Sequence, residues 1–453
     1  MNAETHSNLP DLAICEATVL TGDPKRPIVK DGTILIGDGR ILEIVEGVPE
    51  HPRLEGVERI DARGRVATPG FVNVHTHAIL TMVRGVAEDM GFAPAYTPGV
   101  PHGHDVKPDE AIALARLGAL EALLFGSTLL NDTFVHQDLT LPAMAETGIR
   151  AWGCGRIHDV DFARVHLGEW EHRSEIGRDT LDQAIALHER FDGEADGRMG
   201  VQLSPHAPDT CSRALLEEIA RTSERLHCRV NTHLSQSKVE VARIREREGL
   251  SPPEFLDDLG LLNNRLIAAH CIHVSDTDIA RIGRNGVHVA HIAKGNQTHG
   301  HTAPTQKLRD AGAQVTLGTD NMHADMVETM RWALATGRLQ KSGVDQDWQP
   351  ETVFEAATMG GARAMGLETE IGSLEPGKKA DIVLLDYRRP HLTPCLDPLG
   401  NLVHVAQGRD VEMVFVDGRL VVEGGRSVLI DQDTIVHDAQ KAAEALWARA
   451  KVL

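Results

Sequence analysis

Residues 67–77 read Ala-Thr-Pro-Gly-Phe-Val-Asn-Val-His-Thr-His, an apolar run that ends in two histidines separated by one residue. Pro69 and Gly70 indicate a turn, and the β-branched run after them is too short for a helix, so it predicts a strand. Side chains alternate between the two faces of a strand, so His75 and His77 point the same way and can reach one cation, while Thr76 points away. The spacing fits a metal-binding pair; two histidines that only line a wall are the alternative.

Length and composition describe a large, acidic chain. Its 453 residues can hold one α/β barrel with a smaller domain, or about three average domains. There are 66 acidic and 46 basic residues, which give a formal net charge of −20. No cluster of lysine and arginine interrupts this balance, so nucleic acid and anionic membranes are poor candidates for partners.

The cysteines and the first residues of the chain indicate the cellular compartment of the protein. The six cysteines form no CxxC pair, which predicts free thiols in a reducing environment. Residues 1–10 are polar and lack the basic start and the apolar core of a signal peptide. No apolar run approaches the roughly 18 residues of a membrane span. We therefore expect a soluble, cytoplasmic protein.

Both ends of the chain show the same texture of short antiparallel strands with hairpin turns. The β-branched runs are residues 13–20, 32–36 and 40–45 at one end and residues 381–385, 411–416 and 419–422 at the other. We expect one small composite β-sandwich domain from residues 1–66 and 367–430, a barrel over residues 67–366, and a C-terminal helix over residues 431–453. An independent domain at each end is the alternative.

Between the two ends, short apolar strands alternate with helical segments, which is typical of parallel βα units. The clearest helix is residues 109–125. Besides the opening strand, the candidate strands are residues 127–133, 149–155, 200–206, 228–233, 266–273, 287–292 and 314–320. Eight strands with helical crossovers predict an α/β fold, the (β/α)8 barrel of the TIM type, whose site lies at the carboxyl ends of the strands.

Histidines and one aspartate recur at the ends of these strands. A single histidine in a strand is more often a core residue than a ligand, so the evidence is their shared position. Three imidazoles and one carboxylate suit one Zn²⁺ or Fe²⁺ ion per subunit, with an open position for a water whose pKa the metal lowers. The residues at strand ends are His75, His77, His206, His233, His270 and Asp320.

Several motifs around these residues are specific. They are Val74-His75-Thr76-His77-Ala78, Pro205-His206-Ala207-Pro208, Asn231-Thr232-His233, Ala269-His270-Cys271-Ile272-His273 and Leu317-Gly318-Thr319-Asp320. With them, nearly the whole chain resembles the amidohydrolase superfamily. The similarity is to its cytosine deaminase-like branch, which includes S-adenosylhomocysteine/methylthioadenosine deaminases, guanine deaminases and s-triazine hydrolases.

The resemblance implies roles for the residues that match. His75, His77, His233 and Asp320 would be the metal ligands, Asp320 would also take a proton from the metal-bound water, and His270 would polarise or orient the substrate. It implies a hydrolase in which metal-bound hydroxide displaces ammonia or an amine from an aminated N-heterocycle. By analogy with the family, we expect a homo-oligomer of two or more subunits.

One residue expected to take part in proton transfer departs from the family pattern. Relatives usually have a glutamate three residues after the strand-five histidine, where it shuttles protons; here the residue is Gln236. An amide can hold a substrate by hydrogen bonds but does not titrate near pH 7. Either Asp320, His270 or His323 donates the proton, or the leaving group needs less acid help. A chain that has lost hydrolytic activity is the alternative.

The segment at residues 91–104 is a second departure. Nucleoside deaminases of the branch have a tryptophan and a Pro-x-Glu element there, whose glutamate binds ribose hydroxyls, whereas this chain is rich in proline, glycine and histidine. A free pyrimidine, pterin, purine base or triazine therefore fits better than adenosine. Hydrolytic opening of a cyclic amide or imide, and a catalytically silent binding protein, are the alternatives. The candidate substrate contacts are His206, Arg84, Asn296, His301 and Tyr96, each with a structural alternative, such as a salt bridge from Arg84 to Glu88 or Asp89.

Overall fold

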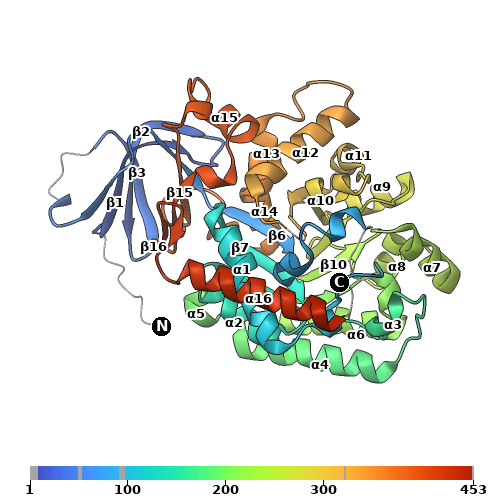
Figure 1. Cartoon of the computed structure of the whole chain (residues 1–453). Coiled ribbons are helices and arrows are strands. Elements are labelled where there is room, and N and C mark those ends of the chain that lie inside the picture. The colour runs from blue at the N-terminus through green and yellow to red at the C-terminus, as the bar shows by residue number, and fades with distance from the viewer. Residues whose placement is uncertain (1–8, 49–53, 91–96, 321–322, 451–453) are drawn as a thin grey trace.

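The computed structural model describes residues 9–48, 54–90, 97–320 and 323–450, and it contains two β-sheets (Figure 1). One sheet has eight parallel strands in chain order, surrounded by helices, which confirms the predicted (β/α)8 barrel. Its strands are β6 (Phe71–Thr76), β7 (Ser127–Phe134), β8 (Arg150–Ile157), β9 (Met199–Pro205), β10 (Val230–Leu234), β11 (Leu266–His270), β12 (His288–His291) and β13 (Gln314–Leu317).

The barrel closes between its first and last strands, beside the predicted metal site. Thr76 forms a parallel bridge with Asp320. The backbone N–H of His77 donates to the carbonyl oxygen of Asp320 at 2.5 Å, and the N–H of Asp320 donates to the carbonyl of His75 at 3.0 Å. Gly318 permits this approach, because a Cβ there would lie 2.8 Å from the His75 carbonyl oxygen. The seam of the barrel thus passes through the backbone of the candidate ligands.

Helices cover the outside of the barrel, and local sequence signals set their ends. In α6 (Arg213–Leu226), the hydroxyl of Ser212 caps the first turn, and Leu215, Leu216 and Ile219 face the core. The other main helices are α1 (Pro108–Leu124), α2 (Gln137–Ala145), α4 (Ser174–Phe191), α7 (Lys238–Glu248), α8 (Pro252–Asp258), α9 (Asp276–Arg284), α10 (Ala293–Thr298), α11 (Thr305–Asp310), α12 (Met326–Gln340), α13 (Pro350–Ala357), α14 (Met359–Met365) and α15 (Pro398–His404).

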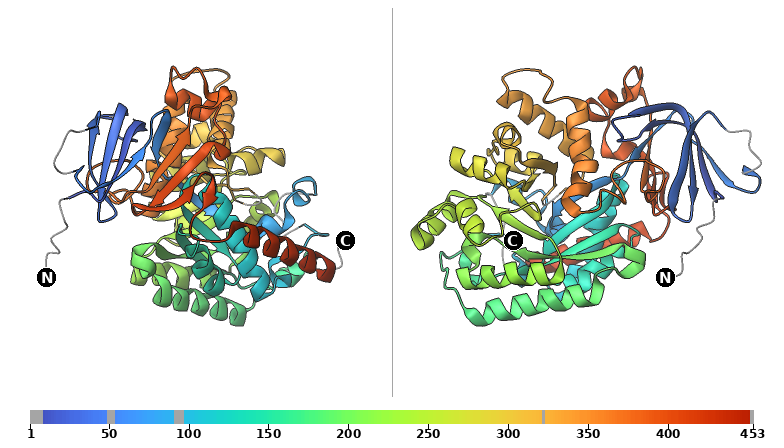
Figure 2. Two further views of the ribbon diagram at one scale, coloured as in Figure 1. Left: turned by 60° about the vertical axis from the view of Figure 1, so that its left-hand side comes forward. Right: turned by 180° about the vertical axis from the view of Figure 1, so that it is seen from behind.

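The second sheet joins the two ends of the chain and lies to one side of the barrel (Figure 2). Its order is β17-β16-β15-β14-β5-β1-β2-β3, with β4 paired to β1. The antiparallel pair β5–β14 links the N-terminal strands to the C-terminal ones, as expected for a composite sheet. The bounds are β1 Leu12–Leu20, β2 Ile28–Gly37, β3 Arg40–Glu46, β4 Glu58–Asp61, β5 Arg65–Pro69, β14 Ile382–Asp386, β15 Val411–Val416, β16 Arg419–Glu423 and β17 Arg426–Ser427.

The C-terminal helix α16 (Gln432–Ala450) packs along α1 on the outside of the barrel (Figure 1). The indole N–H of Trp447 donates to the carbonyl oxygen of Met82 at 2.7 Å, in the short 3-10 helix Ala78–Val83 that follows His77. Arg449 forms an ion pair with Glu110 of α1 at 2.6 Å. The helix therefore braces the segment that leaves the candidate metal site. Within the described ranges, no helix is both long and apolar enough to span a bilayer.

Candidate metal centre

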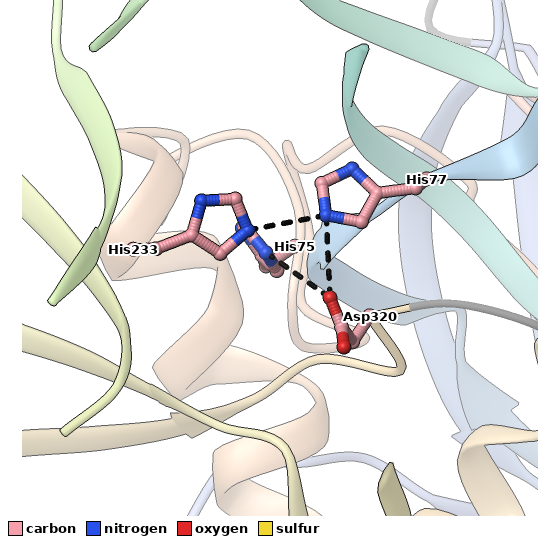
Figure 3. Close-up of side chains that lie close together, drawn as sticks. All are labelled: His75, His77, His233 and Asp320. Carbon is pink, nitrogen blue, oxygen red and sulfur yellow. Dashed lines mark hydrogen bonds and ion pairs between the residues drawn. The ribbon is translucent and has the colours of Figure 1, made fainter. Parts of the chain in front are cut away.

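His75, His77, His233 and Asp320 converge at the carboxyl ends of β6, β10 and β13 (Figure 3). One ligand atom from each lies within 4.8 Å of the others, and all four residues are buried. Oδ1 of Asp320 lies 3.5 Å from Nε2 of His75 and 3.2 Å from Nε2 of His77. The Nε2 atoms of His77 and His233 are 3.2 Å apart. The ligand set implied by the resemblance is thus assembled at one point.

The other ring nitrogen of each ligand histidine is held by an oxygen atom. Because these oxygens accept, each Nδ1 carries the proton and each Nε2 keeps its lone pair for the centre. Metal-ligating histidines in proteins are commonly oriented this way. The acceptors are the side-chain oxygen of Asn231 for His75 (2.9 Å), the carbonyl of Thr133 for His77, and the carbonyl of His206 for His233 (2.6 Å).

The charge state of these residues fits a divalent cation. Nε2 of His75 is buried and makes no hydrogen bond within the described residues. Burial and the neighbouring His206 lower the pKa of His233 well below its usual value, so this imidazole is neutral. Burial alone would raise the pKa of Asp320, but His75 and His77 bring it well below its usual value, so the carboxylate is ionised. Three imidazoles and one carboxylate match the preferences of zinc and of ferrous iron.

Three residues at these strand ends have left-handed backbone conformations. His270 has φ of +74°, Cys271 of +50° and Asp320 of +65°. Such left-handed conformations are unfavourable for residues other than glycine, and they persist where the surrounding structure requires them, often at functional sites. His270 is the last residue of β11, and Asp320 lies three residues after the end of β13.

His270 lies beside the four ligands and is oriented by Asn296. Its Nε2 is 4.0 Å from Oδ1 of Asp320. Its Nδ1–H donates to the side-chain oxygen of Asn296 at 2.9 Å. Burial lowers the pKa of His270 to about 4, against the opposing effect of Asp320. The sequence predicts Asn296 as a substrate contact; the structure places its oxygen on the His270 ring.

His206, a predicted substrate contact, adjoins the centre on the side of His233. The centroids of their rings are 4.8 Å apart. Nδ1 of His206 is hydrogen-bonded to the Thr210 hydroxyl at 3.0 Å, and the ring of Phe162 meets it edge-on at 4.8 Å. Burial and the charge of Arg156 lower the pKa of His206 well below its usual value, which keeps the imidazole neutral.

Gln236 is buried just beyond β10, in a turn held by a carboxylate that the sequence analysis missed. The backbone N–H groups of Ser235 and Gln236 donate to the two oxygens of Glu240, at 2.7 and 2.8 Å. Burial raises the pKa of Glu240 well above its usual value. A glutamate three positions after the capping Ser237 was the available signal. Glu240 thus orients the backbone of the turn.

The remaining predicted contacts pair with other residues or lie outside the described residues. Arg84 is paired with Glu121 of α1. The ring of His301 contacts that of His273, with centroids 5.7 Å apart. Tyr96 falls outside the described residues.

A cavity of about 410 Å³ is lined in part by His323, Lys294 and Glu328. Lys294 and Glu328 form an ion pair at 2.7 Å. Burial and the nearby Lys294 lower the pKa of His323 to about 3. Neither of its ring nitrogens makes a hydrogen bond with a described residue. This neutral imidazole three residues after Asp320 remains a candidate for proton transfer.

A buried centre of three histidines and one aspartate at the carboxyl ends of a (β/α)8 barrel defines a metal-dependent hydrolase. The family model described as Amidohydrolase family matches residues 66–421. The chain belongs to this family, as its motifs predicted.

Individual relatives extend over almost the whole chain. A 5'-deoxyadenosine deaminase of Methanosarcina acetivorans is 33% identical over 448 residues, which cover 98% of this chain and 100% of the relative. A 5-methylthioadenosine/S-adenosylhomocysteine deaminase of Desulforudis audaxviator is 35% identical over 422 residues, or 92% of this chain and 95% of the relative. The crystal structure of an adenosine deaminase from Xanthomonas campestris with bound zinc has a TM-score of 0.86 at 26% identity, covering 97% of this chain and 99% of that one.

Proposed function

We propose that this protein is a metal-dependent aminohydrolase that removes ammonia or an amine from an aminated N-heterocycle. The observation that supports it is the convergence of His75, His77, His233 and Asp320, with each imidazole fixed to present Nε2. The relatives named as deaminases indicate the class of bond.

The four ligands would hold one ion per subunit, and we propose zinc, with ferrous iron as the alternative. The ion supplies an activated water and polarises the group under attack. Asp320 is ionised and lies at the centre, so its carboxylate can accept a proton. His270 donates its Nδ1–H to Asn296, so its Nε2 faces the site as a hydrogen-bond acceptor. It can therefore orient a substrate N–H or a water.

Because Gln236 cannot titrate, we propose that another group delivers the proton to the leaving group. Its amide can hold a ring nitrogen or an exocyclic group by hydrogen bonds but cannot titrate. Among the buried groups near Asp320, His323 is neutral and lines a cavity beside Lys294. We propose that His323, or Asp320 itself, returns the proton to the leaving group.

For the substrate, we propose a free heterocycle, such as a pyrimidine, a pterin, a purine base or a triazine. The segment at residues 91–104 lacks the Pro-x-Glu element expected for ribose recognition. The names of the relatives favour a nucleoside instead. Paired assays of each free base and its nucleoside separate the two, since a nucleoside enzyme would prefer the ribosylated compound.

The test is a panel of aminated heterocycles and cyclic amides, assayed with metal-loaded protein by ammonia release and ultraviolet absorbance. Deamination releases ammonia and preserves the ring chromophore, whereas opening of a cyclic amide or imide abolishes the ring absorbance. His233→Ala and Asp320→Ala should lose both metal and turnover. Full activity in either variant would refute the proposed centre, and protein with stoichiometric metal that is inert on the whole panel would favour a silent binding protein.

Gln236→Glu tests the departure from the family. Introducing a titratable group at this position should change the pH profile of kcat or the range of substrates. Gln236→Asn is the matched control, because it keeps an amide and changes only its reach. An unchanged pH profile with the same substrates in Gln236→Glu would show that this side chain takes no part in the reaction.

We further propose that the protein acts in the cytoplasm as a homo-oligomer. The sequence composition supports the cytoplasmic location, and analogy with the family supports the homo-oligomer. Light scattering of the purified protein measures the oligomeric state directly, and a monomer would contradict the proposal.

A further inference from the structure

A second group of metal-ligating side chains lies apart from the four ligands described above, on the segment before α1. It consists of His102, His104 and Asp105, around the short 3-10 helix Gly103–Asp105. One ligand atom from each lies within 4.8 Å of the others. Nδ1 of His102 is 3.9 Å from Oδ2 of Asp105, and Nε2 of His104 is 3.6 Å from Oδ1 of Asp105. Two imidazoles and one carboxylate therefore bring ligand atoms close together.

A hydrogen bond of His102 determines which of its ring nitrogens faces Asp105. Nε2 of His102 is bonded to the carbonyl oxygen of Thr97 at 3.1 Å. A carbonyl only accepts, so Nε2 carries the proton and Nδ1 presents a lone pair toward Asp105. A ligand histidine whose other nitrogen donates to a backbone carbonyl is the usual arrangement at metal sites. Burial, together with His104 and His166, lowers the pKa of His102, which favours this neutral form.

A third imidazole adjoins the group from another part of the barrel. His166 ends the short helix α3 (Phe162–Val165), and its ring stacks on His102 with centroids 5.1 Å apart. Nδ1 of His166 is buried without a hydrogen-bond partner in the described part of the chain. Its ring thus offers a buried nitrogen beside the group.

We propose that His102, His104 and Asp105 form a second binding site for a divalent transition metal of the zinc class, with His166 completing it. Such an ion would fasten the segment before α1 to α3. Phe162 at the start of α3 contacts His206 beside the catalytic centre, at 4.8 Å between ring centroids. Metal binding at this second site would therefore restrain one wall of the substrate site.

The test measures zinc uptake by the full-length protein, using equilibrium dialysis against Zn²⁺ and elemental analysis. The wild type should take up one equivalent beyond the catalytic one. His104→Gln should lose that extra equivalent or bind it at least about tenfold more weakly, because a ligand is removed. His104 is exposed, so this variant should fold. His437→Gln, at an exposed position on α16, is the matched control and should bind as the wild type does.

Asp105→Asn provides a second variant that keeps the side-chain shape and its acceptor oxygen toward the backbone N–H of His102. It should also weaken the extra equivalent, because the carboxylate charge is lost. His233→Ala disrupts only the catalytic centre, so it should still bind the extra equivalent, and the two sites can be judged separately. Equal uptake by the wild type and His104→Gln would assign any extra zinc to adventitious surface histidines and overturn the proposal.

Discussion

Replacing Asn231 with alanine tests whether hydrogen bonds behind the ligands set the affinity for metal. The side-chain oxygen of Asn231 accepts the Nδ1–H of His75 at 2.9 Å, and both residues are completely buried. Without it, His75 can rotate or change tautomer, and its Nε2 no longer points reliably at the centre. Loss of such a partner weakens metal binding by about 10- to 100-fold, or about 1.4 to 2.7 kcal/mol. Competition with a chromophoric zinc chelator measures this affinity directly.

Asn131→Ala is the matched control for this experiment. The side-chain N–H groups of Asn131 and Asn231 both donate to the carbonyl oxygen of Val74, at 2.9 and 3.1 Å, and both residues are fully buried. Each substitution should lower the free energy of unfolding of the metal-free protein by about 1–3 kcal/mol, since buried hydrogen bonds are lost. Only Asn231→Ala should also weaken zinc binding. Equal losses of zinc affinity in both variants, or none in Asn231→Ala, would refute the proposed role of the His75–Asn231 bond.

Two further predictions concern stability. Arg150 is almost fully buried and pairs with Asp381 at 2.9 Å and with Asp417 at 2.8 Å, so Arg150→Met should lower the free energy of unfolding by about 3–5 kcal/mol in urea titrations, and a change below 1 kcal/mol would contradict this. Burial would raise the pKa of Asp159, but its hydrogen bond with His172 lowers that pKa below the usual value. The ionised Asp159 therefore stabilises the fold at pH values above its unfolded-state pKa. This stabilisation is lost as the pH falls through the folded-state pKa. The stability difference between the wild type and Asp159→Asn should therefore shrink from pH 7 toward about pH 3, and a constant difference would count against the assignment.

The order of the elements was predictable because most barrel strands are short apolar runs between turn signals. The predicted and observed strands overlap throughout, and the composite terminal sheet also formed as expected. Strand ends were less accurate at the site. The run predicted to reach residue 273 ends at His270, and the one predicted to reach residue 320 ends at Leu317. At both places non-glycine residues adopt positive φ, which tertiary contacts impose and local sequence does not signal.

The motifs predicted a candidate ligand set that the structure brings together, whereas the atoms that orient the imidazoles could not be predicted. Two of the acceptors behind the ligand histidines are main-chain carbonyls, of Thr133 and His206, which no side-chain pattern reveals. Arg84 illustrates the same limit. Its sequence neighbours Glu88 and Asp89 suggested a local salt bridge, and the structure also pairs it with Glu121 on α1, which the packing of that helix brings close. Long-range partners depend on the assembled barrel.

The candidate metal ligands and Gln236 are held by different kinds of structure in this barrel. His75, His77 and Asp320 belong to the seam, where backbone hydrogen bonds between the first and last strands fix their separation. The backbone of these three residues is therefore part of the closure of the barrel. Gln236 instead follows β10 in a turn that Glu240 holds by its backbone, and its side chain is not required for that turn. The residue at this position can therefore differ from the glutamate that the family pattern has without disturbing the turn that follows β10.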